Sequence, residues 1–128
     1  MKKTFYQDQI ISFNNVLYSD QFHLKILNRT KRYLDINFHN TIDLKDLALL
    51  QGFSPYHLLR LFKFYYGLTP KQYQISRRIE EAKIKLINGC KVSESCYDVG
   101  FQSITTFSTL FKRKTGMTPR EFKKSNFK

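Results

Sequence analysis

The sequence predicts an all-α protein of about seven helices, arranged as two helix-turn-helix subdomains joined by a long central helix. Three observations predict this class. Apolar residues recur at helical spacing through most of the chain, helix-start signals precede these stripes, and one helical pattern occurs twice. No segment has the alternating pattern of a convincing strand.

The repeat is visible in the segments that start at Leu58 and Phe107, which match with an offset of 49 residues. Upstream, Gly52 matches Gly100 with an offset of 48 residues. One residue has therefore been added in the second copy, between Gly100 and the helix that follows. A chain with two similar helical units suits a partner that is itself periodic, such as duplex DNA.

The charge of the chain is strongly positive and uneven. The chain has 128 residues and a mass of 15.3 kDa, the size of one domain or two small ones, with a net charge of +12 and a pI near 9.8. Residues 1–59 hold seven Lys and Arg against five Asp and Glu, whereas residues 60–128 hold fifteen against five. A field of this sign attracts polyanions, although charge alone also fits a basic surface kept for solubility.

Several other classes of protein find no support in the sequence. No apolar run approaches the roughly 18–20 residues of a membrane span, and the first residues do not form a signal peptide, so we expect a cytoplasmic protein without a membrane partner. Cys90, Cys96 and the three histidines lack zinc-ligand spacing, so we expect no metal, no cofactor and reduced thiols. No nucleophile, base and acid converge, so we expect neither catalytic residues nor an enzyme.

The first clear helical pattern covers residues 22–38. Before it, residues 1–21 form an N-terminal extension of unclear structure, whose apolar residues between Ile10 and Leu17 could make an extra helix or a strand. Within residues 22–38 five apolar residues form a rough stripe, namely Leu24, Leu27, Tyr33, Leu34 and Phe38.

Two short helices follow in the first subdomain, which we place at residues 22–70. Asp43 is an N-cap for a helix that ends before Gly52, and Ser54 caps the next helix, which has proline at its first position. This second helix carries two stripes at i, i+3, i+4 and i+7 spacing. The core stripe is Leu58, Leu61, Phe62 and Tyr65, and the outer stripe is Tyr56, Leu59, Arg60 and Lys63.

A long helix at residues 70–88 connects the subdomains. Thr69 and Gln72 form a capping box at its start, and we expect about 18 residues before Gly89. Its core stripe is Ile75, Ile79, Ala82 and Leu86.

The second subdomain covers residues 89–128 and repeats the first. A short helix at residues 92–99 carries Cys96 at a small, buried position, and Ser103 caps the next helix. That helix has an inward stripe of Phe107, Leu110 and Phe111 and an outward face of Thr105, Ser108, Thr109 and Lys112. A capping box between Thr118 and Glu121 opens a last short helix.

Over residues 22–125 the chain resembles the DNA-binding domain of the AraC/XylS family of transcription regulators. The resemblance rests on the long helix and on the segments GFSPYHLLRLFK, GLTPKQY and GFQSITTFSTLFKRKTGMTP. It implies a homeodomain-like helical domain that inserts two recognition helices into successive major-groove segments. It also implies a transcription regulator, often an activator. The implied partners are double-stranded DNA and RNA polymerase, and the chain would bind DNA as a monomer or within a dimer.

Carried over by position, the resemblance implies a DNA-contacting set on each recognition helix. Thr109 stands where the family commonly has arginine, so we expect the first helix to supply most of the base specificity. Backbone phosphates would be held by Ser54, Ser103, Lys112 and Arg113. The full first set is Ser54, Tyr56, His57, Leu59, Arg60 and Lys63, and the second is Gln102, Ser103, Ile104, Thr105, Thr106, Thr109, Lys112 and Arg113.

Three further expectations remain open from the sequence. A basic helical module that binds an acidic protein or a membrane surface is the alternative to DNA binding. No small-molecule ligand is evident, so the chain either acts without a sensor domain or is the C-terminal part of a longer protein. Ser95 replaces the apolar residue usual in the family, so we expect the second subdomain to be the less stable one.

Overall fold

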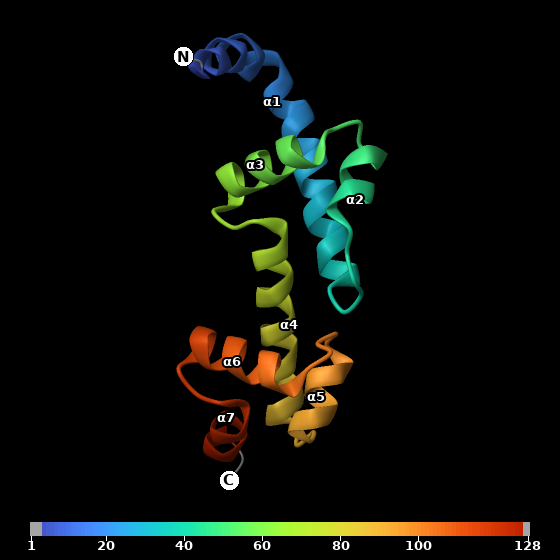
Figure 1. Cartoon of the computed structure of the whole chain (residues 1–128), viewed down its shortest axis with the longest axis vertical. Helices are drawn as coiled ribbons and strands as arrows, with labels where there is room; N and C mark the ends of the chain where they lie inside the picture. The colour runs from blue at the N-terminus through green and yellow to red at the C-terminus, as the bar shows by residue number, and fades with distance from the viewer. Residues whose placement is uncertain (1–3, 127–128) are drawn as a thin grey trace.

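The computed structural model describes the backbone of residues 4–126 and the side chains of residues 21–126. That part of the chain contains seven α-helices and no strand, which confirms the predicted all-α fold (Figure 1). The helices are α1 (Thr4–Asn37), α2 (Leu44–Leu50), α3 (Pro55–Tyr66), α4 (Pro70–Ile87), α5 (Val92–Asp98), α6 (Ile104–Thr115) and α7 (Pro119–Asn126).

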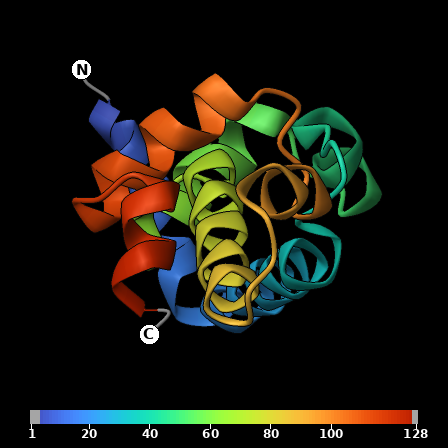
Figure 2. The same ribbon diagram turned by 90° about the horizontal axis from the view of Figure 1, so that it is seen from below.

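The long helix α4 is the axis of the molecule. Helices α1, α2 and α3 lie around its N-terminal end, and α5, α6 and α7 lie around its C-terminal end (Figure 1). Viewed along the long axis, α3 and α6 lie on the same side of α4, and the C-terminal half of α1 lies on the opposite side (Figure 2). The two helices that carry the predicted outward stripes therefore lie on the same side of α4.

The helix starts predicted from the sequence are present. The Thr69 hydroxyl accepts a hydrogen bond from the Gln72 backbone N–H at 3.1 Å, and the Gln72 side chain accepts one from the Thr69 N–H at 3.0 Å, which completes the capping box of α4. Helix α4 has the expected 18 residues. Gly67 and Gly116 end α3 and α6 in the left-handed conformation at φ +77° and +84°, which only glycine adopts without strain.

The inward faces of the two copies match. Leu58 and Phe62 of α3 are fully buried, and so are Phe107 and Phe111 of α6. Leu61 and Leu110 are partly buried, whereas Tyr65, which we expected in the core stripe, is 36% exposed. Cys96 is also fully buried, as predicted, and burial raises the pKa of its thiol. Because equivalent positions fill both cores, the repeat reflects a shared packing pattern.

Helix α1 differs from the sequence-based prediction in its length and in its buried face. It begins at Thr4, so the segment expected to be an extra helix or a strand continues the first helix; its side chains lie outside the described residues. The buried face consists of Ile26, Leu27, Thr30 and Leu34, whereas Leu24 and Tyr33, which we expected in the stripe, are 42% and 44% exposed. The polar Thr30 belongs to the buried face because its hydroxyl donates to the Ile26 carbonyl and accepts from the Gln51 side chain.

The described residues lack two features, a membrane-spanning helix and a metal-binding cluster. None of their helices has the length and apolar character needed to cross a bilayer. They also hold no group of three or more His, Cys, Asp or Glu side chains arranged to bind a metal ion.

Candidate nucleic-acid interface

The first candidate surface is the outward face of α3. Tyr56, Arg60 and Lys63 are exposed and Leu59 is partly buried, on the side opposite the buried Leu58. The positions recur three and four residues apart, so the helix places them in one stripe. We call Tyr56, Leu59, Arg60 and Lys63 the α3 face.

Two residues of the α3 face touch each other. The guanidinium carbon of Arg60 lies 5.5 Å from the centroid of the Tyr56 ring, a cation–π contact one helical turn apart. Tyr56 is 67% exposed, so the ring has a free face toward solvent as well. The contact restricts the rotamers of Arg60 before any partner arrives, which lowers the entropic cost of holding the guanidinium in one place.

His57, which the family resemblance assigned to DNA contact, lies in an aromatic cluster beside α1. Its ring stacks on Phe53 with 4.5 Å between centroids and an interplanar angle of 11°, and it meets the His23 ring edge-on at 6.1 Å. Burial lowers the pKa of His57, with repulsion from His23 and Arg60 as further causes. The structure therefore packs the His57 ring toward α1, although the residue remains exposed and close enough to Arg60 of the α3 face to be repelled by it.

The second candidate surface is the outward face of α6. Its first half carries the exposed side chains of Ile104, Thr105, Thr106 and Thr109, none of which is charged. Its last turn carries the cations. A shallow hollow on the surface follows this last turn, lined by Ser108, Thr109, Lys112, Arg113 and Thr118. Thr118 was not predicted as a site residue. We call Thr105, Ser108, Thr109 and Lys112 the α6 face.

Both outward helices begin at a serine. The Ser54 hydroxyl accepts a hydrogen bond from the His57 backbone N–H at 3.1 Å, and Ser103 does the same for Thr106 at 3.2 Å. Each hydroxyl proton remains available to donate to an acceptor at the helix N-terminus, where the helix dipole favours anions. The exposed Gln102 precedes Ser103 and is the additional residue of the second copy.

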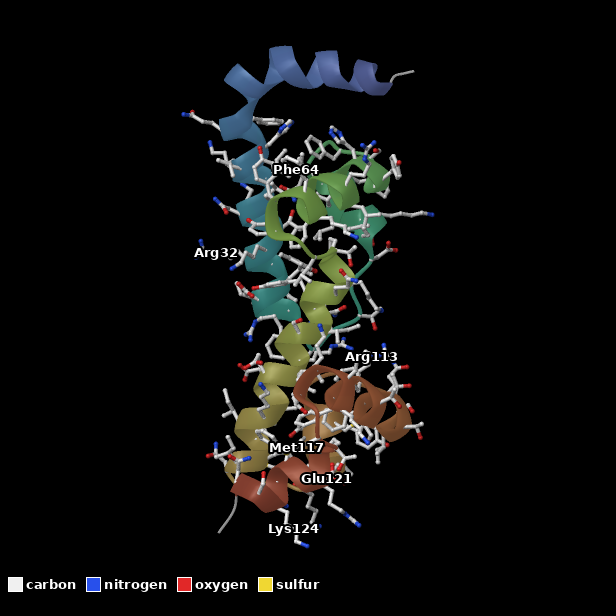
Figure 3. All side chains as sticks on the ribbon, turned by 90° about the vertical axis from the view of Figure 1, so that its left-hand side faces the viewer. Arg32, Phe64, Arg113, Met117, Glu121 and Lys124 are labelled. Carbon is white, nitrogen blue, oxygen red and sulfur yellow. The ribbon has the colours of Figure 1, made fainter. Side chains whose placement is uncertain are left out.

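The asymmetry between the copies extends to one pair that sequence reasoning missed. The 49-residue offset pairs Phe64 with Arg113. Phe64 is 79% exposed on α3, at the position where α6 carries a cation (Figure 3). The repeat alignment contains this pair, so the sequence did hold the signal.

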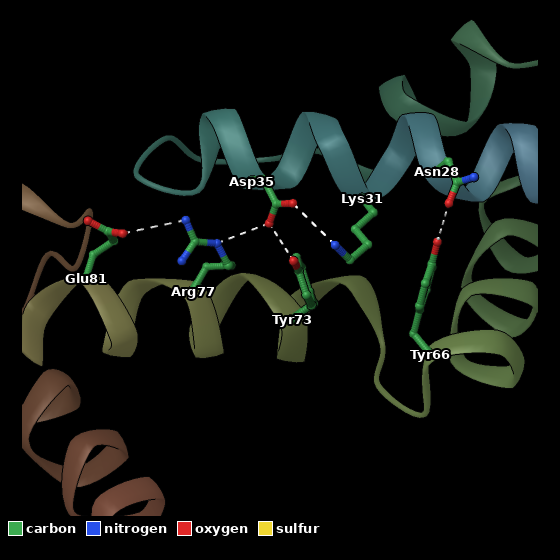
Figure 4. Close-up of polar contacts among 7 residues, drawn as sticks. All are labelled: Asn28, Lys31, Asp35, Tyr66, Tyr73, Arg77 and Glu81. Atoms are coloured by element: carbon green, nitrogen blue, oxygen red, sulfur yellow. Dashed lines mark hydrogen bonds and ion pairs between the residues drawn. The ribbon is translucent and has the colours of Figure 1, made fainter.

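A polar network holds α1 against α4 (Figure 4). The Asp35 carboxylate accepts hydrogen bonds from the Tyr73 hydroxyl and, at 3.1 Å, from Arg77 Nε. Lys31 Nζ lies 3.5 Å from the same carboxylate, and a hydrogen bond with Tyr73 is the main cause that raises the pKa of Lys31. Arg77 also pairs with Glu81 at 3.6 Å. The network fixes the helix that supports both faces.

Comparison with known proteins places the chain among helix-turn-helix regulators. Residues 47–125 match the family described as "Helix-turn-helix domain". An uncharacterized HTH-type transcriptional regulator in the cgkA 5′ region of Pseudoalteromonas carrageenovora is 33% identical over 100 residues, which cover 78% of this chain and 60% of that protein. The bifunctional transcriptional activator/DNA repair enzyme AdaA of Bacillus subtilis is 39% identical over 92 residues, which cover 71% of this chain and 44% of AdaA. The chain thus spans about half the length of these curated relatives.

The fold has also been solved in related proteins. A transcriptional regulator of Chromobacterium violaceum, described as containing an AraC-type DNA-binding domain, superposes with a TM-score of 0.73 at 26% identity, covering 80% of this chain and 93% of that chain. The matched segment contains six of the seven helices wholly or in part, including both outward helices α3 and α6. The protein belongs to the family of AraC-type helix-turn-helix DNA-binding domains.

Proposed function

We propose that this chain is a sequence-specific double-stranded DNA-binding transcription regulator that reads two successive major-groove segments with two different recognition helices. The observation that carries the proposal is the placement of helices α3 and α6 on one side of α4, each at the same position in a copy of one helix-turn-helix. An α-helix fits the major groove of B-DNA, and two such helices in one chain need no second protomer. We therefore propose that the chain binds DNA as a monomer.

The two faces have different chemistry, which supports a division of roles. Arg60 has the planar fork of donors that recognises guanine by two hydrogen bonds, and its contact with Tyr56 orients it. The threonines of α6 offer single hydrogen bonds and methyl contacts to thymine. Lys112 and Arg113, in the last turn of α6, supply charge for phosphates. The first helix then determines most of the base preference, and the bound site is not a palindrome.

Activation of transcription is the regulatory role we propose. AdaA, which is 39% identical over 92 residues, is named a transcriptional activator. We therefore propose RNA polymerase as a partner of this chain, and the cytoplasm as the place where it acts. A promoter-reporter assay with purified RNA polymerase checks this role, because an activator raises transcript output and a repressor lowers it.

The alternative of a basic module for membranes or acidic proteins has less support. Such a module would present its apolar stripes to the partner, whereas Leu58 and Phe62 of α3 and Phe107 and Phe111 of α6 are fully buried. The charge of α6 also gathers at one end instead of covering a whole helix face.

The test begins with selection of bound duplexes from a randomised library, followed by footprinting of the selected site. One chain should protect two major-groove segments about 10–10.5 base pairs apart. The affinity should fall steeply with salt as neutralised phosphates release counterions. Lys45 is an exposed lysine on α2, so Lys45→Ala is the matched control and should keep the DNA affinity of the parent chain. A single protected segment per chain, or an affinity that is flat with salt, would refute the proposal.

A further inference from the structure

The turn between α1 and α2 is held by two side chains of α4. The backbone carbonyl of Phe38 accepts hydrogen bonds from Gln74 Nε2 at 3.0 Å and from Arg78 Nε at 2.6 Å. The carbonyl of Asn40 accepts from the same two side chains, at 2.7 Å and 3.1 Å. Gln74 is only 4% exposed. All four hydrogen bonds run from side chains of α4 to backbone carbonyls of the turn. The turn between α1 and α2 is therefore fixed to α4.

The same turn belongs to the packing of the second helix-turn-helix. The side chain of Phe38 packs against the core cluster that contains Phe107 and Phe111. The guanidinium of Arg77 covers the Phe38 ring at 4.9 Å. A residue that follows α1 thus contributes to the core beneath α6, although α1 itself packs with α2, α3 and α4.

The turn between α5 and α6 approaches the turn between α1 and α2 from the C-terminal half of the molecule (Figure 1). A Cβ atom on Gly100 would lie 2.6 Å from the His39 carbonyl oxygen and 2.9 Å from the guanidinium carbon of Arg78, so only glycine allows the approach. Gly100 also has φ +111°, which disfavours any other residue. The Arg78 guanidinium in turn lies over the Phe101 ring at 5.3 Å.

These contacts form one junction, which we define as Phe38, His39, Asn40, Gln74, Arg78 and Gly100. We propose that the junction sets the distance and rotation between the two recognition helices, and that Arg78 and Gln74 are positioning residues that determine which spacing of DNA half-sites the protein accepts. Ser103, the N-cap of α6, follows Gly100 by three residues, so movement at the junction moves α6. The inference rests on the proposed function.

The geometry of DNA explains why a rigid junction would restrict the spacing of half-sites that the protein accepts. One added base pair shifts a groove segment by about 3.4 Å and rotates it by about 34–36°. Two helices on a rigid frame tolerate little of this change, whereas two helices joined through α4 alone tolerate more. Arg78 suits the role because its guanidinium stays charged and offers a fixed fork of donors to both carbonyls.

The first test measures the junction without DNA. Spin labels at Lys45→Cys on α2 and Tyr97→Cys on α5, both exposed, report the distance between the two helix-turn-helix units in a Cys90→Ser background, where the fully buried Cys96 is protected. We expect one narrow distance distribution for the parent chain and a clearly broader one for Arg78→Met. Gln74→Met is the second variant. Lys83→Met is the control, because it removes a charge of α4 that lies outside the junction and pairs with Glu80 at 3.0 Å. Unchanged widths in both junction variants, with helical content retained, would overturn the proposal.

The second test measures spacing on DNA. Affinities are compared between the selected site and sites with one base pair inserted or deleted between the two protected segments. We expect the parent chain and Lys83→Met to disfavour the altered sites by about tenfold or more, the size of a mismatched base pair, and Arg78→Met to lose most of that preference. A full spacing preference in Arg78→Met would overturn the proposal. If the parent chain binds no duplex specifically, the proposed function fails while the distance measurement still decides whether the junction fixes the two units.

Discussion

The guanidinium of Arg60 lies over the ring of Tyr56, 5.5 Å from its centroid, on an exposed face of α3. This contact orients the side chain best suited to read guanine, so Arg60→Ala should cost roughly 1–3 kcal/mol of binding free energy and relax the preference at one or two base pairs. Binding measurements on a set of single-base-pair variants of the site check both effects. Lys45→Ala should leave the preference intact. Equal losses of affinity on all sequences in Arg60→Ala would contradict the assignment.

Replacing Lys112 should lower the affinity without changing the base preference, in contrast to Arg60→Ala. Lys112 lies in the last turn of α6, beside the hollow that Arg113 and Thr118 also line. A phosphate contact carries no base information, so Lys112→Ala should weaken binding to all duplexes alike and reduce the slope of log affinity against log salt by about 1. Titrations at several salt concentrations on specific and random duplexes measure this. A changed base preference in Lys112→Ala would contradict the division of roles.

Local signals explain why much of this fold could be predicted from the sequence. Caps, left-handed turns and the stripes of α3 and α6 depend on residues within a few positions of each other, and the structure places Ser54, Thr69 and Ser103 at the helix starts as predicted. The repeat gave a second instance of each signal.

Long-range contacts explain what the sequence did not reveal. Thr30 is buried on α1 because Gln51, 21 residues away, supplies its hydrogen bond, and a hydropathy pattern scores threonine as exposed. The bonds from Arg78 to the Phe38 and Asn40 carbonyls join residues about 40 positions apart. Arg78 could be listed from the sequence only as one of several cations on the long helix, since its partners are backbone atoms without a sequence signature.

Asp35 should be the main stabilising residue between α1 and α4. Its carboxylate accepts from Tyr73 and Arg77 and lies near Lys31, while its side chain is 34% exposed. Asp35→Asn keeps the shape but removes the charge that three donors face, so it should lower the free energy of unfolding by about 1–2 kcal/mol after allowance for solvent screening. Urea denaturation measures the loss. Glu80→Gln, whose carboxylate is 60% exposed, is the control and should change stability little; equal effects of the two variants would argue against the network.

Ser95 should weaken the second helix-turn-helix. Its hydroxyl oxygen is fully buried without a hydrogen-bond partner, at the position where the first copy has the buried Leu47. Ser95→Ala removes the unsatisfied hydroxyl and should raise the free energy of unfolding by about 1–2 kcal/mol. Cys96→Ser, at the adjacent and equally buried position, adds a hydroxyl and should lower it by a similar amount. Destabilisation by Ser95→Ala would mean that its hydroxyl has a favourable role in the core.

His57 should make the stability of the first helix-turn-helix depend on pH. Burial, His23 and Arg60 lower the pKa of His57 in the folded state, so the folded chain binds its proton less readily than the unfolded chain, where the pKa is about 6.5. The unfolded state therefore gains the proton first as the pH falls, and stability is complete above about pH 6.5 and decreases below it. Denaturation midpoints between about pH 7.5 and 5.5, above the range in which ordinary carboxylates titrate, measure the contribution of the histidines, and comparison with a His57 variant separates the part due to His57. In His57→Gln the decrease over this interval should be smaller than in the parent chain, because the glutamine keeps a polar side chain beside Phe53 but has no proton to gain. An identical pH dependence in the two proteins would contradict the assignment and direct attention to other titrating groups.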